Sequence, residues 1–295
     1  GTFNTIARAS SISSVTSSVS VTGSNAVKVE ISRKSSSFTH TVVFSFGSYS
    51  KTNTGVGTST SYTIPQSWLN AIPNATSGTA KVTVTTYSGS TKIGSAVSKN
   101  FTLTVPTSVV PSISSVAVAD TVTAVYNYFG NMVQNKSKPK FTITAAGSLG
   151  STIKSYKTEF EGKSYTGATP TTSTITKSGT ASAKITVTDS RGRTATTTKT
   201  WSVVAYAVPK IISFQGFRCL QDGTENYEGT YLKVLLNFSI SSVNEKNTAS
   251  YTIEYKLQTA STWTTLTSGS VYALNDTIVS ASGLFGVDNS FDIRL

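Results

Sequence analysis

Apolar and polar residues alternate along most of this chain, which is the pattern of β-strands that bury one face. Residues 26–31 place apolar side chains at every second position, and residues 40–47 continue in the same way. The alternation also predicts strands over residues 61–65, 81–86, 101–105, 140–145, 153–160, 183–188, 194–204, 231–239 and 250–256. Only residues 66–72, bracketed by Pro65 and Pro73, predict a helical turn. The chain is therefore predicted to be all-β.

Two phrases repeat with a long period. The stretch from Ser77 to Gly89 reappears in similar form from Ser178 to Gly192. A shorter phrase, Ile-Ser-Ser-Val, begins at residue 12, returns at residue 113, and has a looser copy at residue 211. A spacing of about 100 residues is too long for a solenoid repeat and fits one small β-sandwich per period.

The repeat predicts three tandem immunoglobulin-like or fibronectin-III-like β-sandwiches. We place them at residues 9–106, 107–207 and 208–295, after a linker over residues 1–8 that leads out of an upstream domain. Residues 290–295 correspond to the penultimate strand of the earlier repeats, so the third sandwich is predicted to lack its last strand. Three sources could complete it: residues beyond Leu295, which we favour, a neighbouring molecule, or an early strand of the same repeat.

The net charge of +12 does not by itself identify a partner. Lys and Arg are scattered singly along the predicted strands, and the densest cluster, residues 136–140, holds three lysines. Isolated lysines on strands commonly prevent edge-to-edge association, whereas a general attraction to polyanions is the alternative interpretation. We predict no nucleic-acid partner. The chain has no run of 18 apolar residues, so membrane insertion is not predicted either.

Residues for catalysis or metal binding are scarce. His40 is the only histidine, and Cys219 is the only cysteine, which predicts a buried thiol and no disulfide framework. Glu159 and Glu161 lie two apart on a predicted strand, where a solvated edge is the simpler interpretation. The loop around Asp222 carries three carboxylates, which could hold calcium. The EF-hand spacing is absent, so calcium binding there is left open. We predict a protein that is not an enzyme, with no catalytic, cofactor-binding or metal-binding residues.

An aromatic cluster is the best candidate for ligand contact. Tyr126, Tyr128 and Phe129 stand close together beside Asn127 in a predicted loop that enters the second repeat. Tyrosines beside amides suit sugar rings, because a tyrosine presents an apolar face and a polar tip. Alternatively, Tyr126 and Tyr128 belong to an edge strand that faces the core.

The second repeat contains three segments of specific sequence, over residues 134–140, 147–156 and 188–194. These segments resemble a minor structural protein of siphophages that infect streptococci and related Gram-positive bacteria, and the similarity is strongest there. Residues 216–219 and 221–226 of the third repeat are also similar, and residues 5–10 are similar to the family's linker, with Ala7 where proline is usual. The resemblance covers nearly the whole chain.

This resemblance implies tandem immunoglobulin-like domains in a tail or baseplate-associated protein, and it transfers no catalytic residue. It implies a location in the virion tail, outside the cell at the host surface. Other phage tail proteins are the expected partners, and the full-length protein is expected to be multimeric. The predicted function is to space or dock host-recognition parts. The alternatives are a carbohydrate-binding module that contacts host cell-wall polysaccharide, and a bacterial surface adhesin stalk.

Overall fold

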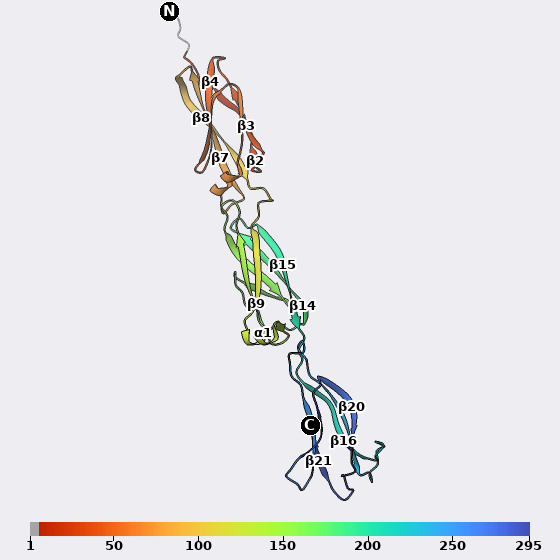
Figure 1. Cartoon of the computed structure of the whole chain (residues 1–295). Helices are drawn as coiled ribbons and strands as arrows, with labels where there is room; N and C mark the ends of the chain where they lie inside the picture. The colour runs from red at the N-terminus through yellow and green to blue at the C-terminus, as the bar shows by residue number, and fades with distance from the viewer. Residues whose placement is uncertain (1–5) are drawn as a thin grey trace, which may run out of the picture. The chain divides into compact units, whose positions relative to one another are not determined.

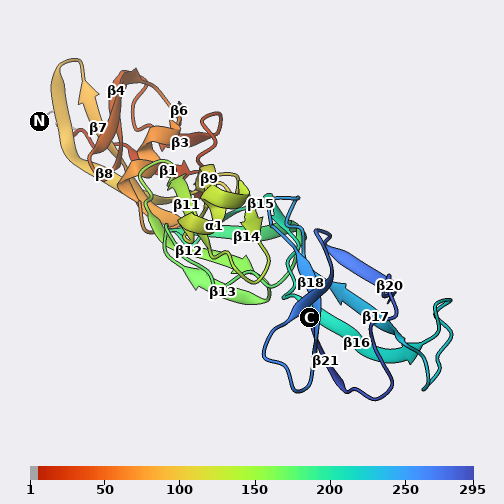
Figure 2. The ribbon, with the colours of Figure 1, turned by 60° about the horizontal axis from the view of Figure 1, so that its bottom comes forward.

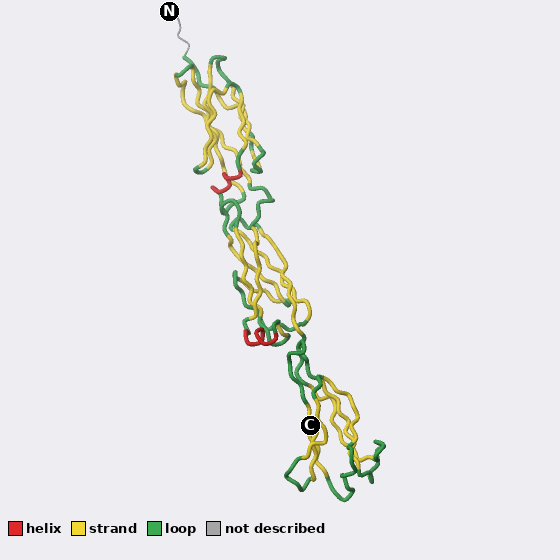
Figure 3. The backbone as a smooth tube through the Cα atoms, in the orientation of Figure 1, coloured by secondary structure: helices red, strands yellow, loops and turns green. Residues whose placement is uncertain are grey.

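The computed structural model describes residues 6–295, in which strands are the main secondary structure and loops connect them (Figures 1 and 3). The two helical elements are the 3-10 helix η1 (Gln66–Ala71) and the α-helix α1 (Thr123–Phe129). The prediction of an all-β chain is confirmed, and η1 lies where the helical turn was predicted. In the described part of the chain, neither helix is long and apolar enough to cross a membrane. Most of the predicted linker lies outside the described residues.

Residues 11–104 form two sheets, which we call the N-terminal sheet pair. The first sheet has the order β1 (Ser11–Val15), β3 (Ala26–Ser32) and β6 (Ser59–Thr63). The second has the order β2 (Ser18–Ser20), β8 (Thr91–Thr104), β7 (Ser77–Ser88), β4 (Phe38–Phe46) and β5 (Tyr49–Val56). Figure 2 shows these strands from a second direction.

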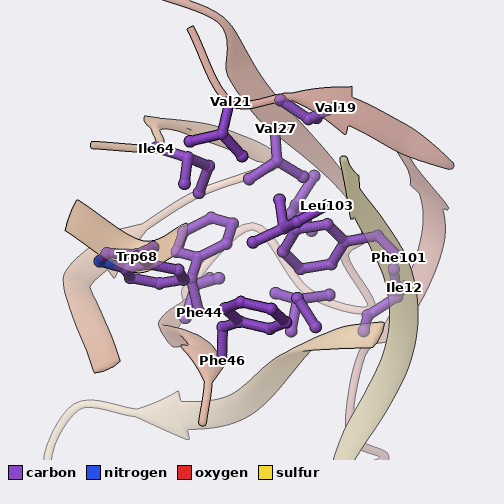
Figure 4. Packing of buried hydrophobic residues seen from close by; sticks show 14 of the residues in the cluster. Ile12, Val19, Val21, Val27, Phe44, Phe46, Ile64, Trp68, Phe101 and Leu103 are labelled. Atoms are coloured by element: carbon purple, nitrogen blue, oxygen red, sulfur yellow. The ribbon is translucent and has the colours of Figure 1, made fainter. Parts of the chain in front are cut away.

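The core of the N-terminal sheet pair follows directly from the period-2 alternation. Every second residue of β4 is buried, and Phe44 at its centre has no exposed surface. The helix η1 closes one end of this core by inserting Trp68, which is 3% exposed and stacks on Phe46 with ring centroids 6.5 Å apart (Figure 4). The ring of Tyr62 packs against Trp68 at 5.5 Å. Aromatic contacts thus join η1 to both sheets.

Residues 112–204 form the middle sheet pair. Its larger sheet has the order β10 (Met132–Val133), β15 (Thr194–Val204), β14 (Gly179–Asp189), β12 (Ile153–Phe160) and β13 (Lys163–Thr166), and its smaller sheet pairs β11 (Pro139–Ala146) with β9 (Ser112–Asp120). The parallel pairing of β10 with β15 repeats that of β2 with β8. The repeated phrases at Ser77 and Ser178 therefore mark equivalent hairpins, β7–β8 and β14–β15.

Residues 210–294 form the C-terminal sheet pair. One sheet has the order β16 (Lys210–Cys219), β17 (Tyr231–Ser239) and β20 (Ala273–Val279), and the other has the order β19 (Thr264–Gly269), β18 (Tyr251–Leu257) and β21 (Phe291–Arg294). The strand β21 pairs antiparallel with β18 and forms the edge of its sheet. Within residues 6–295, no strand takes the position beside β21 that β8 takes beside β7.

Two compact units can be distinguished in the chain. The first contains Gly1–Ala117, Phe141–Pro170 and Ala183–Lys199, and the second contains Val118–Lys140, Thr171–Ser182 and Thr200–Leu295. Their division runs through the middle sheet pair, so it does not coincide with the bounds predicted from the repeat. The three domains at residues 9–106, 107–207 and 208–295, and the missing last strand of the third, remain predictions.

Within the first unit, Arg191 binds four backbone carbonyls from two separate segments. Its side chain is buried, and its guanidinium donates to the carbonyl oxygens of Leu69 at 3.0 Å and Ile72 at 3.1 Å, at the end of η1. It also donates to the carbonyl oxygens of Ser148, at 2.6 Å, and Leu149. A planar guanidinium with five donors can satisfy several acceptors at once. Arg191 thereby ties the N-terminal sheet pair to the loop before β12.

The turn that carries Arg191 is shaped by a buried carboxylate. The Oδ1 atom of Asp189 accepts the backbone N–H groups of Arg191, at 3.0 Å, and Arg193, at 2.8 Å. Arg193 in turn donates to the carbonyl oxygens of Val105 and Pro106, both at 2.9 Å. Burial lowers the pKa of the Arg191 guanidinium, and the charge of Asp189 opposes this shift. We call this turn and its contacts the Arg191 clamp.

Candidate functional site

His40 is a buried structural residue of β4. Its side chain is 1% exposed, and Nδ1 lies 2.9 Å from the carbonyl oxygen of Val56 and 2.8 Å from that of Gly57. Because carbonyls only accept hydrogen bonds, the ring carries its proton on Nδ1. A histidine held in this way joins β4 to the end of β5 and is not placed to act as a base on a substrate.

The paired glutamates predicted at the edge of the middle sheet pair do not form a carboxylate dyad. Glu159 forms an ion pair with Lys157 at 2.7 Å, and this hydrogen bond lowers the pKa of its carboxyl group. Glu161 lies in the turn after β12 at a positive φ of 45°. A glycosidase acid needs a raised pKa, so the lowered pKa of Glu159 is opposite to that requirement.

Two of the three carboxylates in the loop after β16 are engaged in other contacts. Asp222 accepts the backbone N–H of Thr224 at 2.8 Å, which lowers the pKa of its carboxyl group. Glu225 forms an ion pair with Lys233 at 2.9 Å. Over residues 6–295, no three side chains of His, Cys, Asp or Glu gather as a metal site. The geometry around Asp222 therefore gives no support to calcium binding there.

Cys219 is buried at the end of β16, as predicted for a small apolar residue. Desolvation raises the pKa of its thiol, so little of the reactive thiolate is present near neutral pH. This environment does not suit a catalytic nucleophile.

The predicted aromatic cluster lies on a helix, which corrects the loop and edge-strand interpretations. The helix α1 ends at Gly130, whose φ of 69° is left-handed and whose N–H bonds to the carbonyl oxygen of Tyr126 at 2.7 Å. Glycine adopts this conformation without strain, so it terminates the helix. Tyr126 is 45% exposed and Tyr128 is 60% exposed, whereas Phe129 is half-buried.

The helix separates the three aromatic side chains. Residues two apart on a helix do not face the same side, so Tyr126 and Tyr128 point in different directions. The ring of Tyr128 instead meets that of Phe129 edge-to-face, with centroids 4.9 Å apart at an angle of 79°. The cluster thus offers a Tyr128–Phe129 pair and a separate Tyr126, and it does not form one flat platform. Their role in ligand contact remains a prediction.

A third exposed tyrosine, Tyr227, was missed because the carboxylates were the only feature of its loop that indicated a function. It lies in the segment between β16 and β17, and its side chain is 94% exposed. This segment turns back on β16 through an isolated bridge between Cys219 and Glu225 and a 3.1 Å hydrogen bond from the N–H of Asn226 to the carbonyl oxygen of Arg218. A hollow of about 400 Å³ lies between Tyr227 and the outer edge of β16. We call Tyr227, the turn that carries it and this hollow the Tyr227 site.

The fold and these surfaces define an all-β protein with exposed aromatic side chains and no assembled catalytic group in the part that the structure describes. A family model described as "Siphovirus protein of unknown function (DUF859)" matches residues 1–294. The chain therefore belongs to this siphovirus family. The resemblance to siphophage proteins is confirmed at that level, whereas tail association and streptococcal hosts remain predictions.

Similarity to solved structures is broad but distant. A Dpr2 Ig1–Ig2 structure in complex with DIP-Theta Ig1–Ig3 is 10% identical over 96% of this chain and 97% of that chain, with a TM-score of 0.37. A tetra-tandem repeat from the extending region of a large adhesion protein is 12% identical over 97% of this chain and 72% of that chain, with a TM-score of 0.33. A Ca²⁺-stabilised, ice-binding adhesin of an Antarctic bacterium is 13% identical over 98% of this chain and 72% of that chain, with a TM-score of 0.27. No curated protein matches the chain in sequence.

Proposed function

We propose that this chain is a non-enzymatic structural part of a siphophage tail or baseplate, which spaces or docks host-recognition parts at the host surface. The observation that carries this proposal is its siphovirus family membership over residues 1–294, together with an architecture of paired sheets. The engaged His40, Glu159 and Asp222 side chains favour a role in contact over catalysis. Family membership also favours a phage protein over a bacterial adhesin stalk. Its partners would be other tail proteins of the virion, in a multimeric full-length assembly.

The location can be tested on purified virions. Gold-labelled antibody raised against this chain is expected to bind at the tail tip of intact particles in electron micrographs. Particles from a phage with this gene deleted serve as the control. Absence of label from intact particles, in a preparation where denatured particles react with the antibody, would reject the proposal, as would label confined to the head.

A second candidate function is direct binding of host cell-wall polysaccharide. The exposure of Tyr126 and Tyr128 on α1 favours it, because exposed aromatic rings supply the apolar face that a sugar ring needs. The net charge of +12 offers a competing explanation for any retention on cell walls, because anionic wall polymers attract a basic protein.

Substitution of the α1 tyrosines separates these explanations. If α1 contacts sugar, Tyr128→Ala is expected to weaken retention of the chain on host cell walls by about five- to tenfold, since losing one stacked ring removes about 1 kcal/mol. Tyr126→Ala should have a smaller effect, because Tyr126 lacks an aromatic neighbour on the helix. Tyr128→Phe is the matched control and should retain most of the binding. Equal retention of the wild-type and Tyr128→Ala chains, or retention lost at moderate salt, would contradict sugar binding by α1.

A further inference from the structure

We propose that the Tyr227 site binds a pyranose ring of a neutral polysaccharide. This inference rests on the host-surface role proposed above and places the carbohydrate contact at a site separate from α1. It depends on three properties of the segment between β16 and β17: the exposure of one aromatic ring, the rigidity of the turn that carries it, and the polar groups around the adjoining hollow.

The ring of Tyr227 makes almost no contact with the rest of the chain. At 94% exposed, it is the most exposed large apolar side chain among residues 6–295. A tyrosine on a protein surface normally covers part of its ring with neighbouring side chains. A ligand that covers this ring would gain about 25 cal/mol of binding free energy for each Å² of apolar surface removed from water. The ring is thus available as a platform.

The turn beneath Tyr227 is fixed by its own hydrogen bonds. The side-chain Oδ1 of Asn226 accepts the N–H of Glu228 at 2.9 Å, and the backbone carbonyl of Asn226 accepts the N–H of Gly229 at 2.9 Å. Gly229 allows the turn to pass close to β16, because a Cβ atom there would lie 2.2 Å from the carbonyl oxygen of Cys219. A ring held on a rigid turn loses little conformational entropy on binding.

The hollow beside Tyr227 provides the polar partners that sugar hydroxyl groups need. Phe217 lines it as a second aromatic residue, next to Gly216 on the same strand. The Oδ1 atom of Asn226 accepts a hydrogen bond within the turn, so its Nδ2 group is the part of the amide that would donate to a sugar hydroxyl. The Oε1 atom of Glu225 is paired with Lys233, so its Oε2 atom remains to accept a hydrogen bond from a sugar hydroxyl group. A volume of about 400 Å³ lies within the range of about 300–1,000 Å³ usual for small-ligand sites.

The charges around the hollow select a neutral ligand over a phosphate polymer. Asp222 and Glu228 add two carboxylates to the same loop. Of the basic neighbours, Lys233 is paired with Glu225, and the guanidinium of Arg218 donates to the backbone carbonyls of Gly286, at 3.0 Å, and Asn289, at 2.6 Å. No cation is therefore directed at a bound phosphate, although the whole chain is basic. Because the loop is rich in carboxylates while the whole chain is basic, binding at the Tyr227 site can be distinguished from a general attraction of the chain to anionic polymers.

The test is a titration of the purified chain with two probes, measured by isothermal calorimetry. One probe is the neutral polysaccharide fraction of Gram-positive cell walls, and the other is the phosphate-bearing wall polymer. Tyr227→Ala is expected to weaken binding of the neutral fraction at least tenfold, whereas Tyr227→Phe keeps most of the affinity. Val208→Ala is the control, because it removes an exposed apolar side chain (69% exposed) that belongs to neither proposed sugar site, and it should leave this binding unchanged. Because Tyr227 is so exposed, thermal unfolding should be the same for all these variants.

The outcomes separate this proposal from the proposed function. Equal affinity of the wild-type and Tyr227→Ala chains overturns the site, as does the absence of binding to the neutral fraction. Binding of the phosphate polymer alone, lost at moderate salt, also overturns it and shows charge attraction. Sugar binding that depends on Tyr227, together with absence of label from virions, keeps the site and rejects the tail location. Label at the tail tip without any sugar binding keeps the tail location and rejects the Tyr227 site.

Discussion

Replacing Phe44 with alanine is expected to destabilise the N-terminal sheet pair by about 3–5 kcal/mol. Phe44 lies within β4 with no exposed surface and packs in the core of the N-terminal sheet pair (Figure 4). Its ring lies 5.6 Å from that of Tyr62 on the facing sheet. Removing the ring leaves a cavity between two sheets that cannot fully collapse, because hydrogen bonds to β5 and β7 hold β4 on both sides.

Urea unfolding followed by tryptophan fluorescence measures this effect. Trp68 packs in the same core as Phe44, so the transition of the N-terminal sheet pair should move to lower urea concentration. Tyr128→Ala is the control: it also removes an aromatic ring, but from an exposed position, and it should shift the midpoint by little. An unchanged midpoint in Phe44→Ala would show that β4 is not the central core strand.

The strand pattern could be predicted because burial repeats with the same period as the pleat. In β4 and β17, buried and more exposed residues alternate without interruption, so the sequence pattern alone predicts these strands and their buried faces. The repeated phrases similarly identified the β7–β8 and β14–β15 hairpins. Such local signals need no knowledge of distant partners.

The helix α1 was missed because its sequence favours the wrong element. Val125, Tyr126, Tyr128 and Phe129 have aromatic or β-branched side chains, which are typical of strands. The helix depends instead on its end, where Gly130 takes the left-handed conformation. A glycine directly after an apolar segment is a helix-termination signal and could have indicated this.

Exposure could not be predicted for Tyr227. The strand β16 ends at Cys219, before this residue, and the direction of the turn is fixed by the bridge between Cys219 and Glu225 and by the hydrogen bonds of Asn226. A tyrosine in a polar loop is equally compatible with covering a neighbouring strand. The position of such a side chain is decided by tertiary contacts, which no local pattern records.

The role of Arg191 could not be predicted either, because two of its four carbonyl partners are 119 and 122 residues away and the other two are 43 and 42 residues away. The sequence places it in a hairpin turn among scattered basic residues, where a solvated position is the ordinary expectation. Only the folded chain brings the carbonyls of Leu69 and Ile72 within reach of its guanidinium. A basic residue in a turn can therefore be part of the interior when backbone acceptors surround it.

Arg191→Ala is expected to loosen the first compact unit by about 2–4 kcal/mol, because four carbonyls lose a charged donor in a buried place. Arg191→Lys should recover little of this loss, since an ammonium group has three donors on a flexible stem and cannot reproduce the planar fork. Arg8→Ala removes an exposed arginine and serves as the control. Hydrogen exchange should accelerate at the backbone amides of Ile72 and Ser151 in the Arg191 variants and remain unchanged in the control.

A second substitution tests the same contact by a different route. Gly150, in the loop that Arg191 binds, has a φ of 87°, and a Cβ atom there would lie 2.9 Å from the Cα of Asn70. Gly150→Ala should therefore push this loop away from η1 and accelerate exchange at the same amides. If both substitutions act on one contact, the double variant should lose less stability than the two single losses together. Fully additive losses, or unchanged exchange in Arg191→Ala, would show that Arg191 does not hold these segments together. The clamp matters for the proposed function because a part that spaces host-recognition elements transmits position only where its segments are held rigidly to one another.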